Sequence, residues 1–133
     1  HVSTAETSIL NGFNENLTVS ILGLEDLFLS YAGLFPAGHE IHTALSTLKP
    51  MEKISLIERK NHIYIENRHH QAVARLSNKG KAKWQDQTQT IVKARVLGII
   101  RRRKTDGEGY DGKQENVEAW ELPIVEILHK KRV

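Results

Sequence analysis

The apolar residues of this 133-residue chain change their spacing at Pro50, and this change limits the folds that the sequence can adopt. Before Pro50 the apolar residues recur at intervals of three and four, which is typical of amphipathic helices. After Pro50 they recur mostly at every second residue, which is typical of strands with one buried face. We therefore expect an α+β protein in which helices come first and β-structure follows.

Two short helices are predicted within residues 21–50. The first is indicated by apolar residues at helical spacing, namely Leu24, Leu27, Phe28, Tyr31, Leu34 and Phe35. It is expected to end near residues 33–36, where glycine and proline occur. The second is expected over about residues 38–48, with Ile41, Ala44, Leu45 and Leu48 on one face, and Pro50 ends it.

Five short strands are predicted after Pro50. Three of them form a β-meander over residues 54–76, with turns at 61–62 and 67–70. A short helix at 80–87 and a long β-branched strand at 91–103 follow. The last strand begins near Trp120, and Pro123 favours an edge position or a bulge because proline has no N–H to donate. We expect a small antiparallel β-barrel or a curled five-stranded sheet, with the two helices packed at its N-terminal side.

The chain length is typical of one domain. We assign residues 1–20 to an extended lead-in and residues 21–133 to a single domain. Within this domain, residues 21–50 form the helical part and residues 51–129 the β-barrel part. Residues 105–116 contain three glycines and many polar groups, and are expected to form a loop.

Basic residues are concentrated in residues 59–104, where thirteen Lys and Arg face two acids, a local charge of +11 in a chain of +3. Such a stripe over strands favours the binding of nucleic acid through its backbone phosphates. A solvated face that only keeps the protein soluble is the alternative. The residues predicted to contact phosphates are Arg75, Lys79, Lys81, Lys83, Arg101, Arg102, Arg103 and Lys104.

Aromatic residues also lie in or beside the basic half, and single-stranded nucleic acids stack their bases on aromatic rings in basic grooves. Trp84 follows three closely spaced lysines, so we predict that Trp84 or Tyr64 stacks a base. A position in the core is the alternative for Trp84. The other aromatic residues expected in the core are Phe28, Phe35 and Trp120.

No catalytic, cofactor or metal site is predicted. Residues 107–112 match the letters of the dinucleotide-binding fingerprint, but a strand rather than the required helix is expected after them. His39 and His42 can share a helix face and bind a metal, but no third ligand is evident nearby. The acids between 115 and 126 form no catalytic pair and are expected to pair with the basic strand. An independent enzyme is therefore the least favoured interpretation.

Nothing in the sequence indicates secretion or a membrane partner. The chain has no cysteine, and no apolar run reaches the roughly 18 residues needed to cross a bilayer. The N-terminal residues lack the basic and apolar regions of a signal peptide. We expect a cytoplasmic protein.

Four stretches, at residues 22–33, 41–50, 73–77 and 120–127, together resemble the C-terminal end of very large bacterial RecQ-type DNA helicases. The resemblance covers roughly residues 20–128, and none of these stretches is a catalytic motif. It implies that the ATPase lobes lie elsewhere in a longer polypeptide and that this chain is an accessory domain.

The segment at 73–77, which reads VARLS and precedes a predicted helix, also resembles the HIRAN domain. That domain is a small β-barrel of some DNA-remodelling helicases, and it binds single-stranded DNA ends. The Asn-Pro-(Tyr/His)-Asp turn that usually precedes this strand is absent, because residues 67–70 read NRHH. The resemblance implies a small β-barrel that binds DNA.

These observations favour a non-catalytic DNA-binding accessory domain of a helicase with a role in DNA repair. The expected partners are single-stranded or forked DNA and the helicase motor domains of the same polypeptide. The alternative is a protein-interaction module, in which the acidic helical half or an open last strand docks onto helicase lobes or a repair protein. Protein affinity that survives high salt would favour this alternative.

Overall fold

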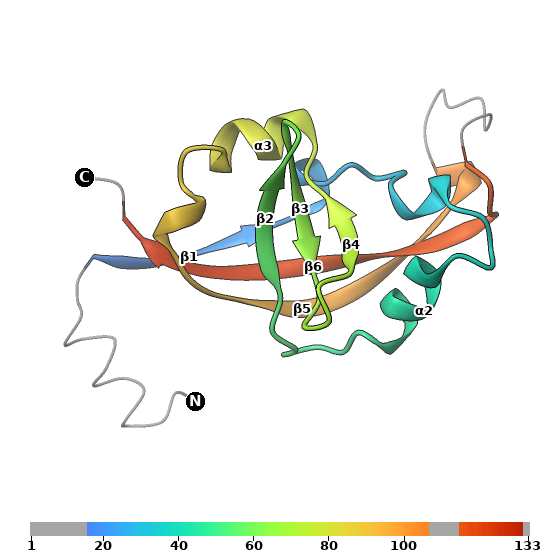
Figure 1. Ribbon diagram of the computed structural model, residues 1–133, viewed down its shortest axis with the longest axis horizontal. Helices are drawn as coiled ribbons and strands as arrows, with labels where there is room; N and C mark the ends of the chain where they lie inside the picture. Colours follow the sequence, from blue (N-terminus) through green and yellow to red (C-terminus); the bar gives the residue numbers. More distant parts are fainter. Residues whose placement is uncertain (1–15, 107–114, 132–133) are drawn as a thin grey trace.

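The computed structural model describes residues 16–106 and 115–131 of the chain (Figure 1). The elements within them are β1 (Leu17–Leu22), η1 (Leu24–Asp26), η2 (Ala32–Leu34), α2 (Glu40–Thr47), β2 (Ser55–Arg59), β3 (His62–Glu66), β4 (Ala72–Arg75), α3 (Asn78–Trp84), η3 (Thr88–Thr90), β5 (Ile91–Arg103), η4 (Lys104–Asp106) and β6 (Ala119–Lys130). The glycine-rich residues 107–112 lie outside the described part. No helix in the described part is long and apolar enough to span a membrane.

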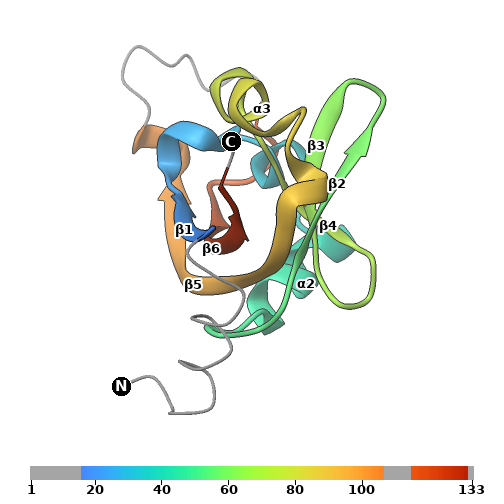
Figure 2. The same cartoon turned by 90° about the vertical axis from the view of Figure 1, so that its left-hand side faces the viewer.

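The six described strands form two three-stranded antiparallel sheets, β1-β6-β5 and β2-β3-β4. Isolated bridges link Lys53, before β2, to Arg95 of β5, and Leu27, after η1, to Leu76, after β4. Figure 2 shows how strongly β5 bends beside the meander. The α+β class and the antiparallel pairing are confirmed. There are six strands rather than five, and their ladders do not close into a barrel.

The core lies between the two sheets, and strand alternation explains which residues enter it. In β3, Ile63 and Ile65 are buried and alternate with the half-exposed His62 and Tyr64. In β6, Val125 and Ile127 are fully buried. Each such side chain contributes about 1.5–3 kcal/mol by leaving water. α2 packs its apolar face against this core, as predicted, through Ile41, Ala44 and Leu45.

The first predicted helix is absent, and this prediction was wrong. Two short 3-10 turns, η1 and η2, replace it. Between them, Leu27 bridges Leu76, and the Phe28 N–H donates to the Arg75 carbonyl oxygen at 2.8 Å. This pairing with the end of β4 holds the backbone extended, so a tertiary contact overrides the helical spacing of the apolar residues.

β1 lies partly within the segment that the sequence analysis assigned to a lead-in. It pairs with β6 from Leu17–Lys130 to Leu22–Val125, which places β6 in the centre of its sheet. β6 is therefore not an open edge, so the alternative in which an open last strand docks onto a partner does not apply to it. Pro123 lies beyond the end of β1 and pairs only with Ile99 of β5, so its missing N–H leaves no gap in a ladder with β1.

Candidate nucleic-acid interface

Two of the predicted phosphate-binding lysines are held in ion pairs between α3 and η1. Lys79 Nζ lies 2.9 Å from Glu25 Oε2, and Lys83 Nζ lies 2.8 Å from Asp26 Oδ1. The hydrogen bond from Lys79 lowers the pKa of Glu25, and the hydrogen bond to Asp26 raises the pKa of Lys83. The acidic N-terminal part of the chain therefore offsets the charge that the sequence analysis assigned to DNA.

The backbone fixes this junction between α3 and η1. Ser77 caps α3 by accepting from the Gly80 N–H at 3.1 Å, and its own N–H donates to the Asp26 carbonyl oxygen at 2.9 Å. Gly80 permits this approach, because a Cβ there would lie 3.0 Å from the Asp26 carbonyl carbon and closer still to its oxygen. The backbones of α3 and η1 are thus closely packed at this junction.

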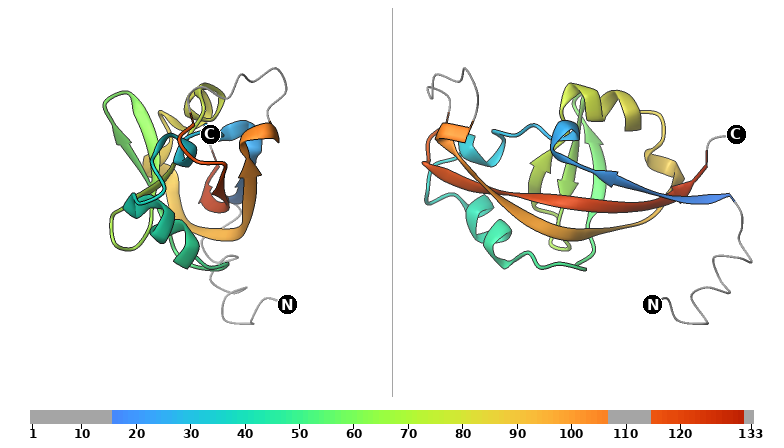
Figure 3. Two further views of the ribbon diagram at one scale, coloured as in Figure 1. Left: turned by 90° about the vertical axis from the view of Figure 1, so that its right-hand side faces the viewer. Right: turned by 180° about the vertical axis from the view of Figure 1, so that it is seen from behind.

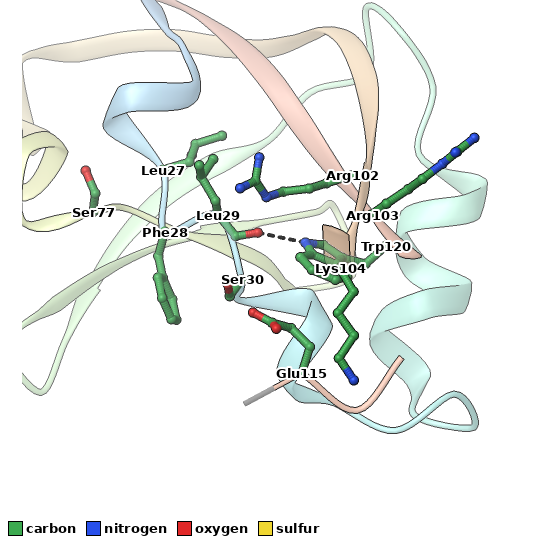
Figure 4. Close-up of a pocket in the computed structure, with 10 residues that line it drawn as sticks. All are labelled: Leu27, Phe28, Leu29, Ser30, Ser77, Arg102, Arg103, Lys104, Glu115 and Trp120. Carbon is green, nitrogen blue, oxygen red and sulfur yellow. Dashed lines mark hydrogen bonds between the residues drawn. The ribbon is translucent and has the colours of Figure 1, made fainter. Parts of the chain in front are cut away.

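Trp84 is 5% exposed and meets the ring of His129 edge-to-face at a centroid distance of 4.9 Å. A buried indole offers no face to a base, so the structure does not support Trp84 as a stacking residue. The alternative core position is the one observed. Trp120 is also buried as expected, and its Nε1 donates to the Leu29 carbonyl oxygen at 2.7 Å (Figure 4).

The basic run at the end of β5 is divided between two recesses. Arg102, Arg103 and Lys104 line one of them together with Phe28 and Trp120, and Figure 4 shows that Arg102 extends over Leu29 toward Leu27. Arg101 borders a separate recess beside His42 of α2. The predicted pairing of the basic strand with nearby acids is confirmed for Arg95, whose Nε donates to Glu126 Oε1 at 2.7 Å.

The outward side of the meander carries the cluster that best fits a nucleic-acid site. We call it the aromatic face, and its members are Phe28, Tyr31, Arg59, His62, Tyr64 and Arg75. Strand register gathers the last four, because Arg59 pairs with His62 and Tyr64 pairs with Arg75. The extended backbone at Phe28 continues the face beyond β4.

Cations and rings alternate across the aromatic face. The Arg75 guanidinium carbon lies 4.4 Å from the centroid of Phe28 and 5.9 Å from that of Tyr31. Tyr31 meets Tyr64 edge-to-face at 6.0 Å, and the Arg59 guanidinium carbon lies 5.5 Å from the Tyr64 centroid. These are distances at which cation–π attraction operates. Phe28 is therefore half-buried on a surface rather than in the core, where it was expected.

The two arginines of the face differ in their partners. Arg59 forms an ion pair with Glu66, which is buried. Arg75 forms no ion pair within the described residues, and its buried Nε has no hydrogen-bond partner there. Burial raises the pKa of Tyr31, so its hydroxyl remains a donor at neutral pH. Burial, and then the charges of Arg75 and Lys81, lower the pKa of His62 below 6.5.

Of the residues predicted to bind DNA, the structure brings Arg75 and Tyr64 together, whereas Lys79 and Lys83 pair with acids of η1 and Trp84 is buried. Four members of the face were not predicted from the sequence, namely Phe28, Tyr31, Arg59 and His62. A signal existed for two of them. The turn was predicted at residues 61–62, but it is formed by Lys60 and Asn61, so Arg59 and His62 flank it. A tight hairpin places its flanking residues opposite each other.

The two histidines considered as metal ligands have structural roles. His39 Nδ1 accepts from the Ile41 N–H at 3.0 Å and caps α2, and His42 Nε2 lies 3.0 Å from the Phe35 carbonyl oxygen. Within residues 16–106 and 115–131, no group of three or more His, Asp or Glu is placed to hold a metal ion.

Comparisons with known proteins give no independent information about this site. No protein-family model, curated protein or solved structure matches the chain. The candidate interface therefore rests on the contacts described above, with the aromatic face as its best-supported part.

Proposed function

We propose that this chain is a non-catalytic domain that binds single-stranded nucleic acid on its aromatic face. The observation that carries the proposal is Arg75, whose guanidinium covers Phe28 beside the half-buried Tyr31 and Tyr64 and lacks an acidic partner among the described residues. Half-exposed rings on the outward side of a small antiparallel sheet provide stacking surfaces for unpaired bases. The neighbouring guanidinium groups provide charge for the phosphates between them.

The proposed partner is DNA that is single-stranded or forked, and the proposed setting is a helicase with a role in repair. This setting is supported by the resemblance of residues 20–128 to the end of RecQ-type helicase polypeptides. In that setting the motor domains of the same polypeptide would deliver the unwound strand to the aromatic face. The chain would hold the strand and carry out no chemistry on it.

The binding energetics follow from the two kinds of contact. Each base that stacks on an aromatic side chain contributes about 1–3 kcal/mol and tolerates any base. Each phosphate neutralised by Arg75 or Lys81 adds about 0.7 to the slope with which the logarithm of affinity falls against the logarithm of salt concentration. Lys79 and Lys83 contribute little, because Glu25 and Asp26 already face them.

The test is fluorescence-anisotropy binding of a labelled oligothymidylate of about 10 nucleotides, a length within the usual site size of small β-barrel domains. We expect affinity that falls steeply with salt and that drops about 10-fold in Tyr64→Ala, which corresponds to about 1.4 kcal/mol. Lys79→Ala is the matched control and should bind like the wild type. Absence of binding at low salt, or equal binding by Tyr64→Ala, would overturn the proposal.

A second variant decides between the aromatic face and the end of β5. If the run at Arg101, Arg102 and Arg103 holds the strand, replacing all three by Ala weakens binding more than Tyr64→Ala does. If the aromatic face holds it, the triple variant loses only part of the salt dependence. Circular dichroism of each variant checks that the fold is retained.

A protein-interaction module is the second candidate function. Its specific support is β1, an edge strand whose Val19 and Ile21 are 55% and 54% exposed. The view from behind in Figure 3 shows β1, β6 and β5 without a helix in front of them. Such an edge can pair with a strand of another protein. Helicase-lobe binding that survives high salt and is lost in Ile21→Lys would favour this function.

A further inference from the structure

A recess lies beside the aromatic face, between the β2–β3 turn and α3, two segments that lie close together in Figure 1. Its lining includes Lys60, Asn61 and His62 from the turn and Lys81, Gln85 and Asp86 from α3 and the residues after it. Lys60 and Asn61 have φ angles of 47° and 68°, the left-handed pair of a tight hairpin turn. This turn holds Arg59 and His62 opposite each other at the edge of the recess.

Lys81 is the α3 lysine that faces this recess. Lys79 and Lys83 are four residues apart and share the helix face that meets Glu25 and Asp26. Lys81 lies between them in sequence and so points to the other side. It forms no ion pair within the described residues, in contrast to both of its neighbours.

We infer that this recess holds one phosphate of the strand bound on the aromatic face, between the ammonium group of Lys81 and the imidazole of His62. The inference rests on the proposed function and names its phosphate contacts. The His62 and Tyr64 ring centroids are 6.2 Å apart, so a phosphate beside His62 adjoins a base stacked on Tyr64. The recess thus extends the aromatic face toward α3.

The charged groups around His62 determine what such a phosphate would do. Arg59 faces His62 from β2, Tyr64 from β3, Arg75 from β4 and Lys81 from α3. Two acids, Glu58 and Asp86, also line the recess. Arg59 already has Glu66 as its partner, so the cations left for a phosphate are Arg75, Lys81 and Lys60.

His62 should therefore take up a proton when the strand binds. In the free protein, burial and the charges of Arg75 and Lys81 keep the pKa of His62 low, so the ring is neutral at pH 7. A phosphate between these groups screens their repulsion and favours the imidazolium form. The affinity for the strand then rises as the pH falls through the pKa that His62 has in the complex. It levels off once the pH is below the lower pKa that His62 has in the free protein.

The test combines two titrations. In the first, the His62 ring signals are followed by NMR against pH in sodium sulfate and in sodium chloride of equal ionic strength. Sulfate keeps its charge over this range and presents tetrahedral oxygens like those of a phosphodiester, with one more negative charge. In the second, oligothymidylate affinity is measured between about pH 8 and about pH 5, a range in which histidine is the side chain that normally titrates. The variants are His62→Gln and Lys81→Ala, with Lys79→Ala as the matched control.

We expect sulfate to raise the pKa of His62 in the wild type and in Lys79→Ala, but not in Lys81→Ala. Oligothymidylate affinity should increase several-fold toward low pH, and His62→Gln should abolish most of that increase. Strong binding that does not vary with pH, or that Lys81→Ala leaves unchanged, would overturn the inference and leave the proposed function standing. A sulfate response without any affinity for oligothymidylate would overturn both, since the recess would then be an anion site unconnected with a strand.

Discussion

The α3–η1 junction and the aromatic face are built from the same kinds of residue, yet they differ in the exposure of their rings and in the acidic partners of their cations. At the junction, two lysines face carboxylates and the nearby Trp84 is buried. On the aromatic face, two arginines lie over rings that remain half-exposed. The comparison teaches that a basic, aromatic-rich segment is informative about binding only when its acidic partners are known.

The partners differ because of where the chain brings its acids. Glu25 and Asp26 come from the acidic first part of the chain and meet lysines 54 and 57 residues away. On the aromatic face, Glu66 is the acid that reaches an arginine, and it pairs with Arg59. The Arg75 side chain is held instead by contacts with the rings of Phe28 and Tyr31, which leave its charge available to a ligand.

The largest effect on stability is expected at Gly80, where α3 approaches the backbone of η1 most closely. Gly80→Ala places a Cβ against the Asp26 carbonyl group, so α3 must separate from η1. We expect the free energy of unfolding to fall by about 3 kcal/mol, although alanine favours a helix more than glycine does by about 1 kcal/mol. Urea denaturation followed by circular dichroism measures the change.

Gly98→Ala is the matched control, because a Cβ at Gly98 meets nothing within 4 Å. Its free energy of unfolding should stay within about 0.5 kcal/mol of the wild type. Equal stability of the two variants would show that the junction is loose, and its lysines would then be free to bind a ligand after all.

The next effect concerns Asp26, which is 3% exposed and accepts from the Gly23 N–H at 3.2 Å through Oδ2. Asp26→Ala leaves that N–H without its acceptor and removes the nearer of the two carboxylates that face Lys83, and we expect a loss of about 2 kcal/mol in the free energy of unfolding. Asp26→Asn keeps an acceptor for Gly23 and should lose less. If the two variants are equally destabilised, the charge of Asp26 rather than its hydrogen bond holds the junction.

Much of the fold could be predicted from local pattern. The long strand at Ile91–Arg103 has the predicted bounds, and α2 and the β-meander occur where the periodicity placed them. The segment around Leu27 and Phe28 could not be predicted in the same way. Its helical spacing is real, but its backbone pairs with the end of β4, and no local pattern encodes a partner so distant in the chain.

The candidate site was only partly predictable for the same physical reason. The two-residue spacing of Lys79, Lys81 and Lys83 is enough to place Lys81 on the opposite side of a helix from its neighbours. Which side meets acids depends on the docking of η1, and that docking is a tertiary contact. Arg75 was predicted to bind phosphate, whereas its position over Phe28 follows from the same unexpected strand-like segment.

A binding experiment on Arg75 sharpens the comparison further. Arg75→Lys keeps the charge but loses the planar group that covers Phe28, so oligothymidylate affinity should fall several-fold while its salt slope stays the same. Arg75→Ala should also lower, by about 0.7, the slope of the logarithm of affinity against the logarithm of salt concentration, since one phosphate contact is lost. Anisotropy titrations at several salt concentrations give both quantities. Identical behaviour of the Lys and Ala variants would mean that the guanidinium plane matters more than its charge.

The smallest effect is expected from the exposed pair at the junction, and it appears only in acid. Because Lys79 lowers the pKa of Glu25, the pair stabilises the folded state above the pKa that Glu25 has in the unfolded chain. That stabilisation is lost as pH falls through the lower pKa of the folded state. Glu25→Gln should therefore show a slightly smaller decrease in urea midpoint between about pH 6 and about pH 3 than the wild type does.

Glu58→Gln is the control for this measurement, because Glu58 is exposed and forms no ion pair within the described residues. It should follow the wild-type decrease. If Glu25→Gln also follows it, the contact between Lys79 and Glu25 does not persist in solution. Lys79 would then be as available to a phosphate as Lys81, and the contrast between the two regions would rest on Lys83 and Asp26 alone.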